Sequence, residues 1–490
     1  MKDLKIIFRD TGAVLLTVGF ATLVAVIPSL VYSEYSYAPW IIATALVFFA
    51  VGGLFWLSGR GDGEPKIKHA MVIAALSWLI ISLIGSIPFW QIPYNLDTLA
   101  YMDPLSAFFE SMAGWTGTGL TMVTYESKLP HTLQFWRTYI QWIGGVGVIV
   151  LTLIILARRG TGSFTLYRSE AREEKIHPSI ISTVKSMWWI LLIYTLIAIT
   201  VLFIAGMPIW EAVNHAMTGL TTGGFSVMDD SITSYGTAVH IALIPIMVAG
   251  AISFAAHYDF LRGRIKDFFT DVQTLALLVL VFTGIVVLAL LNMDLYPSFA
   301  QSFKYAAFQF ASALTCTGFN TADVGLWGAD AKMLLSLSMI IGGAAGSTAG
   351  GIKLFRAVLL TKGVGWKIKK IFLPPKSTFG HKLGSKTLSA DQANEELSQA
   401  AVLSFMWLIL LFVGIMTLLV TLNGSAASLE NVIFEVCSAQ GNVGLSTGVT
   451  GIGMNPAAKA MLIINMWVGR LEIIPILVLF RSLISGHGFF

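Results

Sequence analysis

Long runs of residues without a charged side chain dominate this sequence of 490 residues. A helix needs about 20 apolar residues to cross a hydrocarbon layer of about 30 Å, and helices satisfy their own backbone polar groups in lipid. Nine such runs lack Asp, Glu, Lys and Arg, and in a tenth only Arg470 and Glu472 are charged. The runs cover residues 11–33, 35–59, 70–96, 138–157, 186–210, 231–256, 272–293, 333–352, 397–429 and 460–480. The sequence therefore predicts an all-α integral membrane protein that crosses the bilayer ten times.

The composition excludes several other classes of protein. Only 12% of the residues are charged, whereas soluble domains carry about 25%. This argues against a soluble enzyme, a disordered regulator and a nucleic-acid-binding module, so we expect membrane lipid and no nucleic acid as surroundings. The two cysteines, Cys316 and Cys437, are too few for a disulfide framework or a zinc site.

Charged residues predict the orientation of the chain. If the chain crosses ten times, 25 of the 31 Lys and Arg residues fall on one side, which the positive-inside rule assigns to the cytoplasm. We therefore expect a multi-pass protein of the cell membrane with both termini cytoplasmic. Thirteen of the 27 acidic residues fall on the outer side, where a negative mouth would raise the local concentration of cations.

Four segments repeat one pattern, in which small or polar residues precede a glycine that is followed by Phe or Leu. These segments are 112–121, 217–226, 312–320 and 437–446. An apolar stretch of about ten to twelve residues precedes each one, and as a helix it would span only about 15–18 Å. The glycine-bearing segment must then return through the membrane, where irregular backbone is tolerated only if it is buried or lines a cavity. The repeats predict one central cavity with pseudo-fourfold symmetry.

The residue types of these segments favour a cation as the ligand. Small residues allow backbone carbonyls to replace the hydration shell of an ion, and glycine reaches the φ values that such a turn requires. The C-terminal end of each short helix also carries partial negative charge. The expected organisation is an N-terminal helix pair followed by four units of helix, pore loop and helix. Their bounds are 1–66 for the pair and 67–180, 181–266, 267–396 and 397–490 for the units.

Two features interrupt the apolar pattern. Arg470 lies near the middle of the last run, where a charge is costly, and Glu472 cannot face it on one helix. Either Arg470 gates the pathway, or it pairs with an acid on another helix. The second feature is the segment 342–353, whose many glycines should break a helix. We expect an irregular mid-membrane loop there, the alternative being an unbroken, tightly packed helix. His215, at the position of Glu110, Gln309 and Glu435, is expected to brace its pore loop.

Three motifs resemble the Trk, Ktr and HKT superfamily of potassium transporters, and within it the bacterial TrkH/TrkG branch. They are the segments 141–147, 342–353 and 465–472. The resemblance implies four units of two membrane helices and a pore loop, usually paired as a homodimer. It also implies a cytosolic ring of TrkA-type regulatory subunits, which carry the ATP/ADP or NAD site.

The resemblance further implies the ion-binding residues, with potassium as the transported ion and no organic cofactor on this chain. Coordination would fall on Gly117, Thr118, Gly119, Thr222, Gly223, Gly224, Cys316, Thr317, Gly318, Asn442, Val443 and Gly444. In plant relatives a serine in the first unit accompanies sodium preference, so Gly119 favours potassium. The family's intramembrane gate would fall on Arg470, Gly342, Gly343, Gly346, Gly350 and Gly351.

These observations predict a potassium-translocating membrane subunit with a gated, channel-like pore and a carbonyl selectivity filter. A sodium- or proton-coupled secondary cation transporter is the first alternative, although such proteins usually contain two inverted repeats. A membrane-embedded enzyme is the second alternative. It would need a cluster of ionisable residues within the spans, where only Arg470 and Glu472 are charged, so we expect no enzyme.

Overall fold

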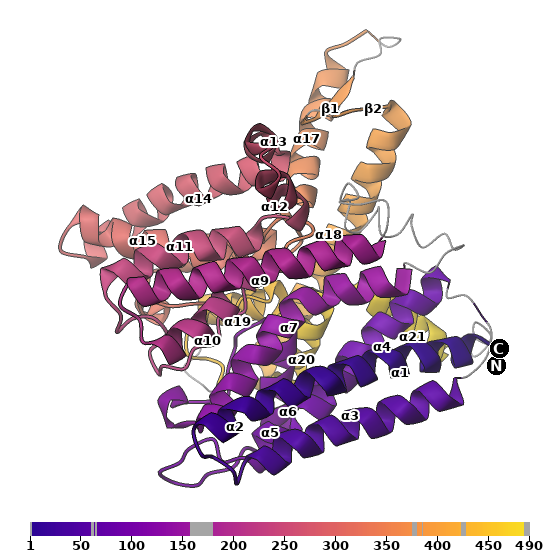
Figure 1. Ribbon diagram of the computed structural model, residues 1–490. Helices are drawn as coiled ribbons and strands as arrows, with labels where there is room; N and C mark the ends of the chain where they lie inside the picture. The colour runs from indigo at the N-terminus through magenta and orange to yellow at the C-terminus, as the bar shows by residue number, and fades with distance from the viewer. Residues whose placement is uncertain are drawn as a thin grey trace.

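The computed structural model describes residues 2–59, 63, 66–156, 180–374, 380–384, 386–422 and 428–484, and these residues are almost entirely helical (Figure 1). In the described residues one sheet is found, in which β1 (His381–Leu383) pairs antiparallel with β2 (Lys386–Leu388) beyond one end of the helical body. The predicted all-α membrane class is confirmed. The basic segment 157–179 and both chain ends, residue 1 and residues 485–490, lie outside the described residues.

The N-terminal helix pair packs closely because small residues face each other. The first helix of the pair is α1 (Lys2–Thr22), continued by η1 (Leu23–Val26) and α2 (Ile27–Val31), and the second helix is α3 (Ala38–Ser58). A Cβ placed on Gly12 would lie 2.6 Å from the carbonyl oxygen of Gly52. Such small residues let membrane helices approach each other.

Four units follow, and each begins with a long helix and a short one. The long helices are α4 (Ile67–Gly85) with its continuation α5 (Ile87–Gln91), α9 (Ile180–Ile204), α14 (Val272–Leu291) and α18 (Ala390–Thr421). The short ones, which we call pore helices, are α6 (Pro104–Thr116), α10 (Ile209–Leu220), α15 (Phe299–Leu314) and α19 (Leu429–Gly441). At 12 to 16 residues they reach about 18–24 Å, which is longer than the predicted 15–18 Å but too short to cross a hydrocarbon layer of about 30 Å. Short connecting turns are η2 (Glu126–Lys128), α13 (Ile265–Thr270), η3 (Met293–Leu295) and η4 (Val324–Leu326).

The final helix of each unit differs from the others. In the first unit α7 (His131–Leu156) is one helix of 26 residues. In the second, α11 (Thr237–Ala251) and α12 (Phe254–Leu261) meet at 108°, and in the fourth, α20 (Pro456–Arg470) and α21 (Ile474–Ile484) meet at 112°. In the third, α16 (Ala329–Ile341) and α17 (Leu354–Ile371) are separated by the residues 342–353, which we call the glycine loop.

The expectation of ten simple spans is therefore only partly met. Among the described residues six helices are long and apolar enough to cross a bilayer, and the two bent pairs raise this number to eight. The runs 231–256 and 460–480 were predicted as spans and are bent pairs. The run 333–352 is not a helix throughout, because α16 ends at Ile341 and the glycine loop follows. The predicted irregular loop is thus confirmed, and the alternative of an unbroken helix is wrong.

Candidate functional site

The four pore loops share one backbone conformation. After each pore helix, a first residue adopts positive φ and a glycine two positions later does so again. The first residues, which we call the inner turn residues, are Gly117 (φ 67°), Thr222 (53°), Cys316 (58°) and Asn442 (54°). The later residues, which we call the glycine ring, are Gly119 (73°), Gly224 (74°), Gly318 (89°) and Gly444 (102°). Positive φ is unusual for residues with a side chain, so this fourfold agreement reflects one shared turn.

The glycine ring is closed by contacts between successive units. A Cβ on Gly119 would lie 2.3 Å from the carbonyl oxygen of Gly223, and one on Gly224 would lie 1.9 Å from that of Thr317. The same position on Gly318 is 2.1 Å from the Val443 oxygen, and on Gly444 it is 2.3 Å from the Thr118 oxygen. The contacts run from the first unit to the fourth and back to the first. Glycine is thus required both by backbone conformation and by packing, and the sequence indicated only the first reason.

A polar side chain of every pore helix holds the segment that follows the ring. Glu110 accepts a hydrogen bond from the backbone of Met122 at 2.7 Å, and Gln309 accepts one from Thr321 at 3.0 Å. The ring of His215 lies 2.9 Å from the Ser226 hydroxyl, and Glu435 accepts from the Ser446 hydroxyl at 2.7 Å. The predicted bracing role of these positions is confirmed. In the described residues no group of three or more His, Cys, Asp and Glu could hold a metal ion.

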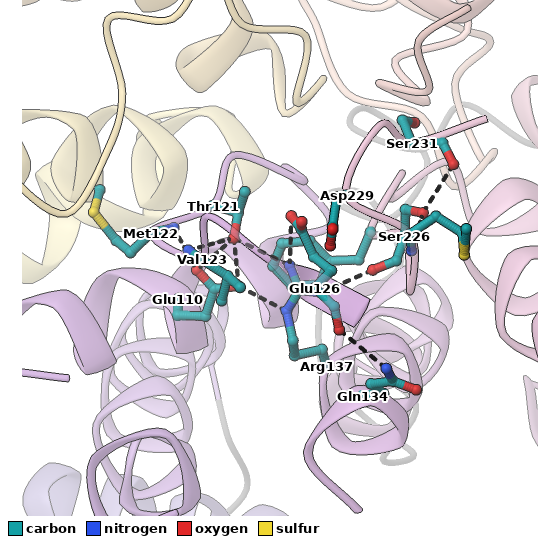
Figure 2. Close-up of polar contacts among 12 residues, drawn as sticks. Glu110, Thr121, Met122, Val123, Glu126, Gln134, Arg137, Ser226, Asp229 and Ser231 are labelled. Atoms are coloured by element: carbon teal, nitrogen blue, oxygen red, sulfur yellow. Dashed lines mark hydrogen bonds and ion pairs between the residues drawn. The ribbon is translucent and has the colours of Figure 1, made fainter. Parts of the chain in front are cut away.

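Arg137 joins the first two pore loops and was missed in the sequence (Figure 2). Its guanidinium donates to Glu110 at 2.8 Å, to the Ser226 carbonyl at 2.8 Å and to the Thr121 hydroxyl at 3.1 Å. Both charged side chains are at most 1% exposed. A buried ion pair is tolerated when further hydrogen bonds satisfy its remaining atoms. The available signal was the position of Arg137, immediately before the predicted span 138–157.

A cavity of about 640 Å³ lies against all four ring glycines, on the side that we call the outer side. Four acidic residues line it: Glu126, Asp229, Asp230 and Asp323. Asp229 accepts hydrogen bonds from the backbone and hydroxyl of Ser127 at 2.7 and 2.9 Å. Burial raises the pKa of Glu126 to about 8, although Arg137, 4.0 Å away, opposes the shift. These acids are four of those expected at a negative mouth.

Arg470 lies on the opposite, inner side of the ring. Its guanidinium donates to the carbonyl oxygens of Thr348 at 2.8 Å, Gly144 at 2.9 Å and Gly145 at 3.1 Å. One terminal nitrogen lies 4.0 Å from the position of a Cβ on Gly117. All three acceptors are uncharged, so no acid pairs with Arg470 among the residues that the structure describes.

Glu472 pairs with a different arginine. The guanidinium of Arg356, at the start of α17, donates to Glu472 at 2.5 Å, and both lie beside the break between α20 and α21. The expectation that Arg470 and Glu472 are the charged residues of this region is therefore incomplete. Its basic partner, Arg356, lies 116 residues away in the sequence. Arg356 follows the apolar run 333–352, so a count of charges within the runs did not include it.

The glycine loop passes directly beneath the ring. Gly342, Gly346 and Gly351 have φ values of 71°, 75° and 78°, so they require the freedom of glycine. A Cβ on Gly343 would lie 2.5 Å from the Ala349 side chain, and one on Gly350 would lie 2.1 Å from the Gly441 carbonyl oxygen. The loop that contains the five glycines predicted for a gate thus contacts Arg470, through the carbonyl of Thr348.

The helical fold and the ring formed by the four pore loops place this protein in the class of pore-loop membrane proteins with four units. The chain belongs to the TrkH family of cation transport proteins, whose family model matches residues 38–488. It is 36% identical over 484 residues to an uncharacterized cation transporter of Methanocaldococcus jannaschii, covering 98% of this chain and 96% of the relative. It is 32% identical over 449 residues to the Trk system potassium uptake protein TrkH of Salmonella typhimurium, covering 89% and 90% of the two chains.

A solved structure has the same fold. The crystal structure of the potassium transporter TrkH from Vibrio parahaemolyticus superimposes with a TM-score of 0.83 at 26% sequence identity. The match covers 97% of this chain and 98% of the other. The chain is therefore a multi-pass membrane protein of a cation transport family.

Proposed function

We propose that this chain is the membrane subunit of a potassium uptake system and that potassium crosses it through the glycine ring. The closed fourfold ring is the observation that carries the proposal, because four equivalent turns can surround an ion on one axis. Several relatives are Trk system potassium uptake proteins, which supports potassium as the ion.

In this proposal the four pore loops coordinate the ion through backbone carbonyls, which replace its water shell. The coordinating segments are 117–119, 222–224, 316–318 and 442–444. The carbonyl of Gly223 also accepts a hydrogen bond from the Gln141 side chain at 2.7 Å, which leaves its second lone pair for an ion. The C-terminal ends of the four pore helices contribute partial negative charge, and the acidic cavity concentrates cations at the outer side.

Arg470 and the glycine loop form the gate in this proposal. A positive charge 4.0 Å from the position of a Cβ on Gly117 repels an ion that leaves the inner end of the ring. Among the described residues the guanidinium is held by neutral carbonyls, and no acid in this part of the chain pairs with its charge. Opening then requires Arg470 and the glycine loop to move away from the axis.

A cytosolic partner would control this movement. We propose a TrkA-type ring, with its own ATP/ADP or NAD site, on the basic face formed by the end of α17, and a homodimer in the cell membrane with cytoplasmic termini. The exposed residues Lys367, Lys369 and Lys370 belong to this face. Their replacement by glutamate should abolish complex formation with such a ring, as measured by co-purification. A complex that forms unchanged would exclude this surface.

Growth of a bacterium that lacks its own potassium uptake systems tests the proposal. Expression of this chain with its regulatory partner should restore growth at low potassium, and no growth from well-expressed protein would contradict it. A variant with Gly224→Ala serves as a matched negative control, because its added Cβ would lie 1.9 Å from the Thr317 oxygen.

A further inference from the structure

The glycine loop and Arg470 lie next to the inner turn residues of the four units. The hydroxyls of Thr348 and Thr222 are 3.1 Å apart. The backbone of Gly343 and Gly350 lies close to the thiol of Cys316. A Cβ on Gly350 would lie 3.0 Å from that of Asn442, and Arg470 lies beneath Gly117. The floor of the ring and the top of the proposed gate are therefore one packed layer.

Thr348 makes more of these connections than its neighbours in the glycine loop. Its backbone carbonyl accepts from Arg470 at 2.8 Å, and its backbone N–H donates to the carbonyl of Gly250 at 3.2 Å. Its hydroxyl lies 2.9 Å from the Gly250 oxygen, 3.3 Å from the Leu220 oxygen and 3.1 Å from the Thr222 hydroxyl. The side chain is buried, with 2% exposed.

The donor and acceptor roles of this hydroxyl follow from its single proton. The Gly250 carbonyl is the nearest acceptor, so Thr348 donates to it and accepts from the hydroxyl of Thr222. Thr348 thereby connects the glycine loop of the third unit to α11 and to the pore loop of the second unit. Arg470 of the fourth unit is held on the same residue.

We propose that Thr348 is a positioning residue that latches the glycine loop to the inner end of the second pore loop. Breaking the latch releases the loop and loosens the inner turn residues in the same step. The proposal rests on the proposed function, because it assigns to one side chain the coupling between the gate and the ion-coordinating turn.

Cys316 provides a readout that does not depend on transport. Its side chain is fully buried under the glycine loop, and Cys437 is the other cysteine of the sequence. In a Cys437→Ser background, a charged methanethiosulfonate reagent applied to the purified full-length protein therefore reports exposure of Cys316. Mass spectrometry identifies the modified residue, so the same measurement is possible with Cys437 retained.

The variant Thr348→Val keeps the shape of the side chain and removes its hydrogen bonds. Loss of one hydrogen bond shifts an opening equilibrium by about fivefold, and the variant loses both the bond to Gly250 and the bond from Thr222, so the modification rate of Cys316 should rise by at least that factor. Thr348→Ser should react at the parent rate, because it retains the hydroxyl. Ser347→Ala is the matched control, since in the part of the chain that the structure describes the Ser347 hydroxyl bonds within the loop alone, to the carbonyl of Ala344 at 2.6 Å and to the backbone N–H of Ala349 at 3.3 Å.

The latch is contradicted if folded Thr348→Val reacts at the parent rate, or if Ser347→Ala accelerates the reaction equally. Rubidium flux is measured on the same samples in liposomes. A faster reaction of Cys316 in Thr348→Val, with no flux in parent or variant, would contradict the proposed function but support the latch. Normal parent flux with an unchanged reaction rate would remove the latch alone.

Discussion

The outer and inner halves of the four units follow different rules. On the outer side the four pore loops have the same turn, with positive φ at equivalent positions and a closed ring of glycines. On the inner side the four final helices do not share one form: α7 is continuous, those of the second and fourth units bend by 108° and 112°, and that of the third unit is interrupted by the glycine loop.

This difference follows from what each half must do in the proposed function. An ion on the axis is coordinated from all sides, so every unit must present the same backbone. An obstruction needs only one or two units, and the other final helices are then free to support it. We therefore expect substitutions in the ring to act on permeation and selectivity, and substitutions beneath it to act on opening.

The largest effect is expected from Gly224→Ala. The added Cβ would lie 1.9 Å from the Thr317 oxygen at a residue with φ of 74°, so both packing and backbone oppose it. Rubidium uptake into liposomes should fall to the level of empty liposomes. Gly236→Ala is the control, because nothing lies within 4 Å of its added Cβ. Uptake by Gly224→Ala at the rate of this control would show that the ring does not limit permeation.

Arg470→Ala should have the opposite effect and raise flux. A hydrogen bond from a charged donor contributes about 1.5–3 kcal/mol, so losing the equivalent of one bond shifts the closed state by about tenfold or more. Flux in liposomes without the cytosolic partner measures the change, and Arg470→Lys should fall between parent and alanine variant. Reduced flux in a well-folded Arg470→Ala protein would be incompatible with a gate.

Gly119→Ser should change selectivity more than rate. Its Cβ would lie 2.3 Å from the oxygen of Gly223, a less severe approach than the 1.9 Å between a Cβ on Gly224 and the Thr317 oxygen. The displaced carbonyl should admit sodium better, and the ratio of rubidium to sodium flux should fall several-fold. An unchanged ratio would remove this segment from the ion-coordinating set.

The smallest expected effect is a pH dependence set by Glu126. Because burial raises its pKa from 4.5 to about 8, the carboxyl is neutral below that pH and negative above it, with Arg137, Glu110 and Asp229 as the charged neighbours. Two unit charges 10 Å apart in water interact by about 0.4 kcal/mol. Flux at low potassium should therefore rise about twofold as external pH passes upward through about 8.

Glu126→Gln should abolish this rise, whereas Asp294→Asn, away from the cavity, should retain it. A pH profile that is identical in parent and Glu126→Gln protein would exclude Glu126 as its source. Burial of this acid also means that the folded state binds more protons, so its contribution to stability decreases as the pH rises from about 4.5 to 8.

The regular half of the molecule was the more predictable one. Four copies of a motif located the glycine ring, and the density of glycine from Gly342 to Gly351 predicted a broken helix. The bend after Ala251 was not predicted, because its backbone groups bond to the glycine loop of another unit: the Ala251 carbonyl accepts from Ala344 at 2.9 Å, and the Phe254 N–H donates to the Gly346 carbonyl at 3.1 Å. Ser253 then starts α12 by accepting from the backbone of Ala256.

Partners that are distant in sequence were also beyond prediction. The choice of Arg356 rather than Arg470 for Glu472 depends on how α17 packs beside α20 and α21. Local periodicity carries no information on such pairings. The packing reason for the ring glycines was hidden in the same way, since each clash involves a carbonyl of the next unit.

The most direct test of conduction through the glycine ring is the reversal potential of current through the purified protein in a planar bilayer. With unequal potassium on the two sides, we predict reversal close to the potassium equilibrium potential, unchanged when a proton or sodium gradient is added. Gly224→Ala should show no current. A reversal potential that moves with the proton or sodium gradient at fixed potassium would contradict a channel-like pore and identify a coupled transporter.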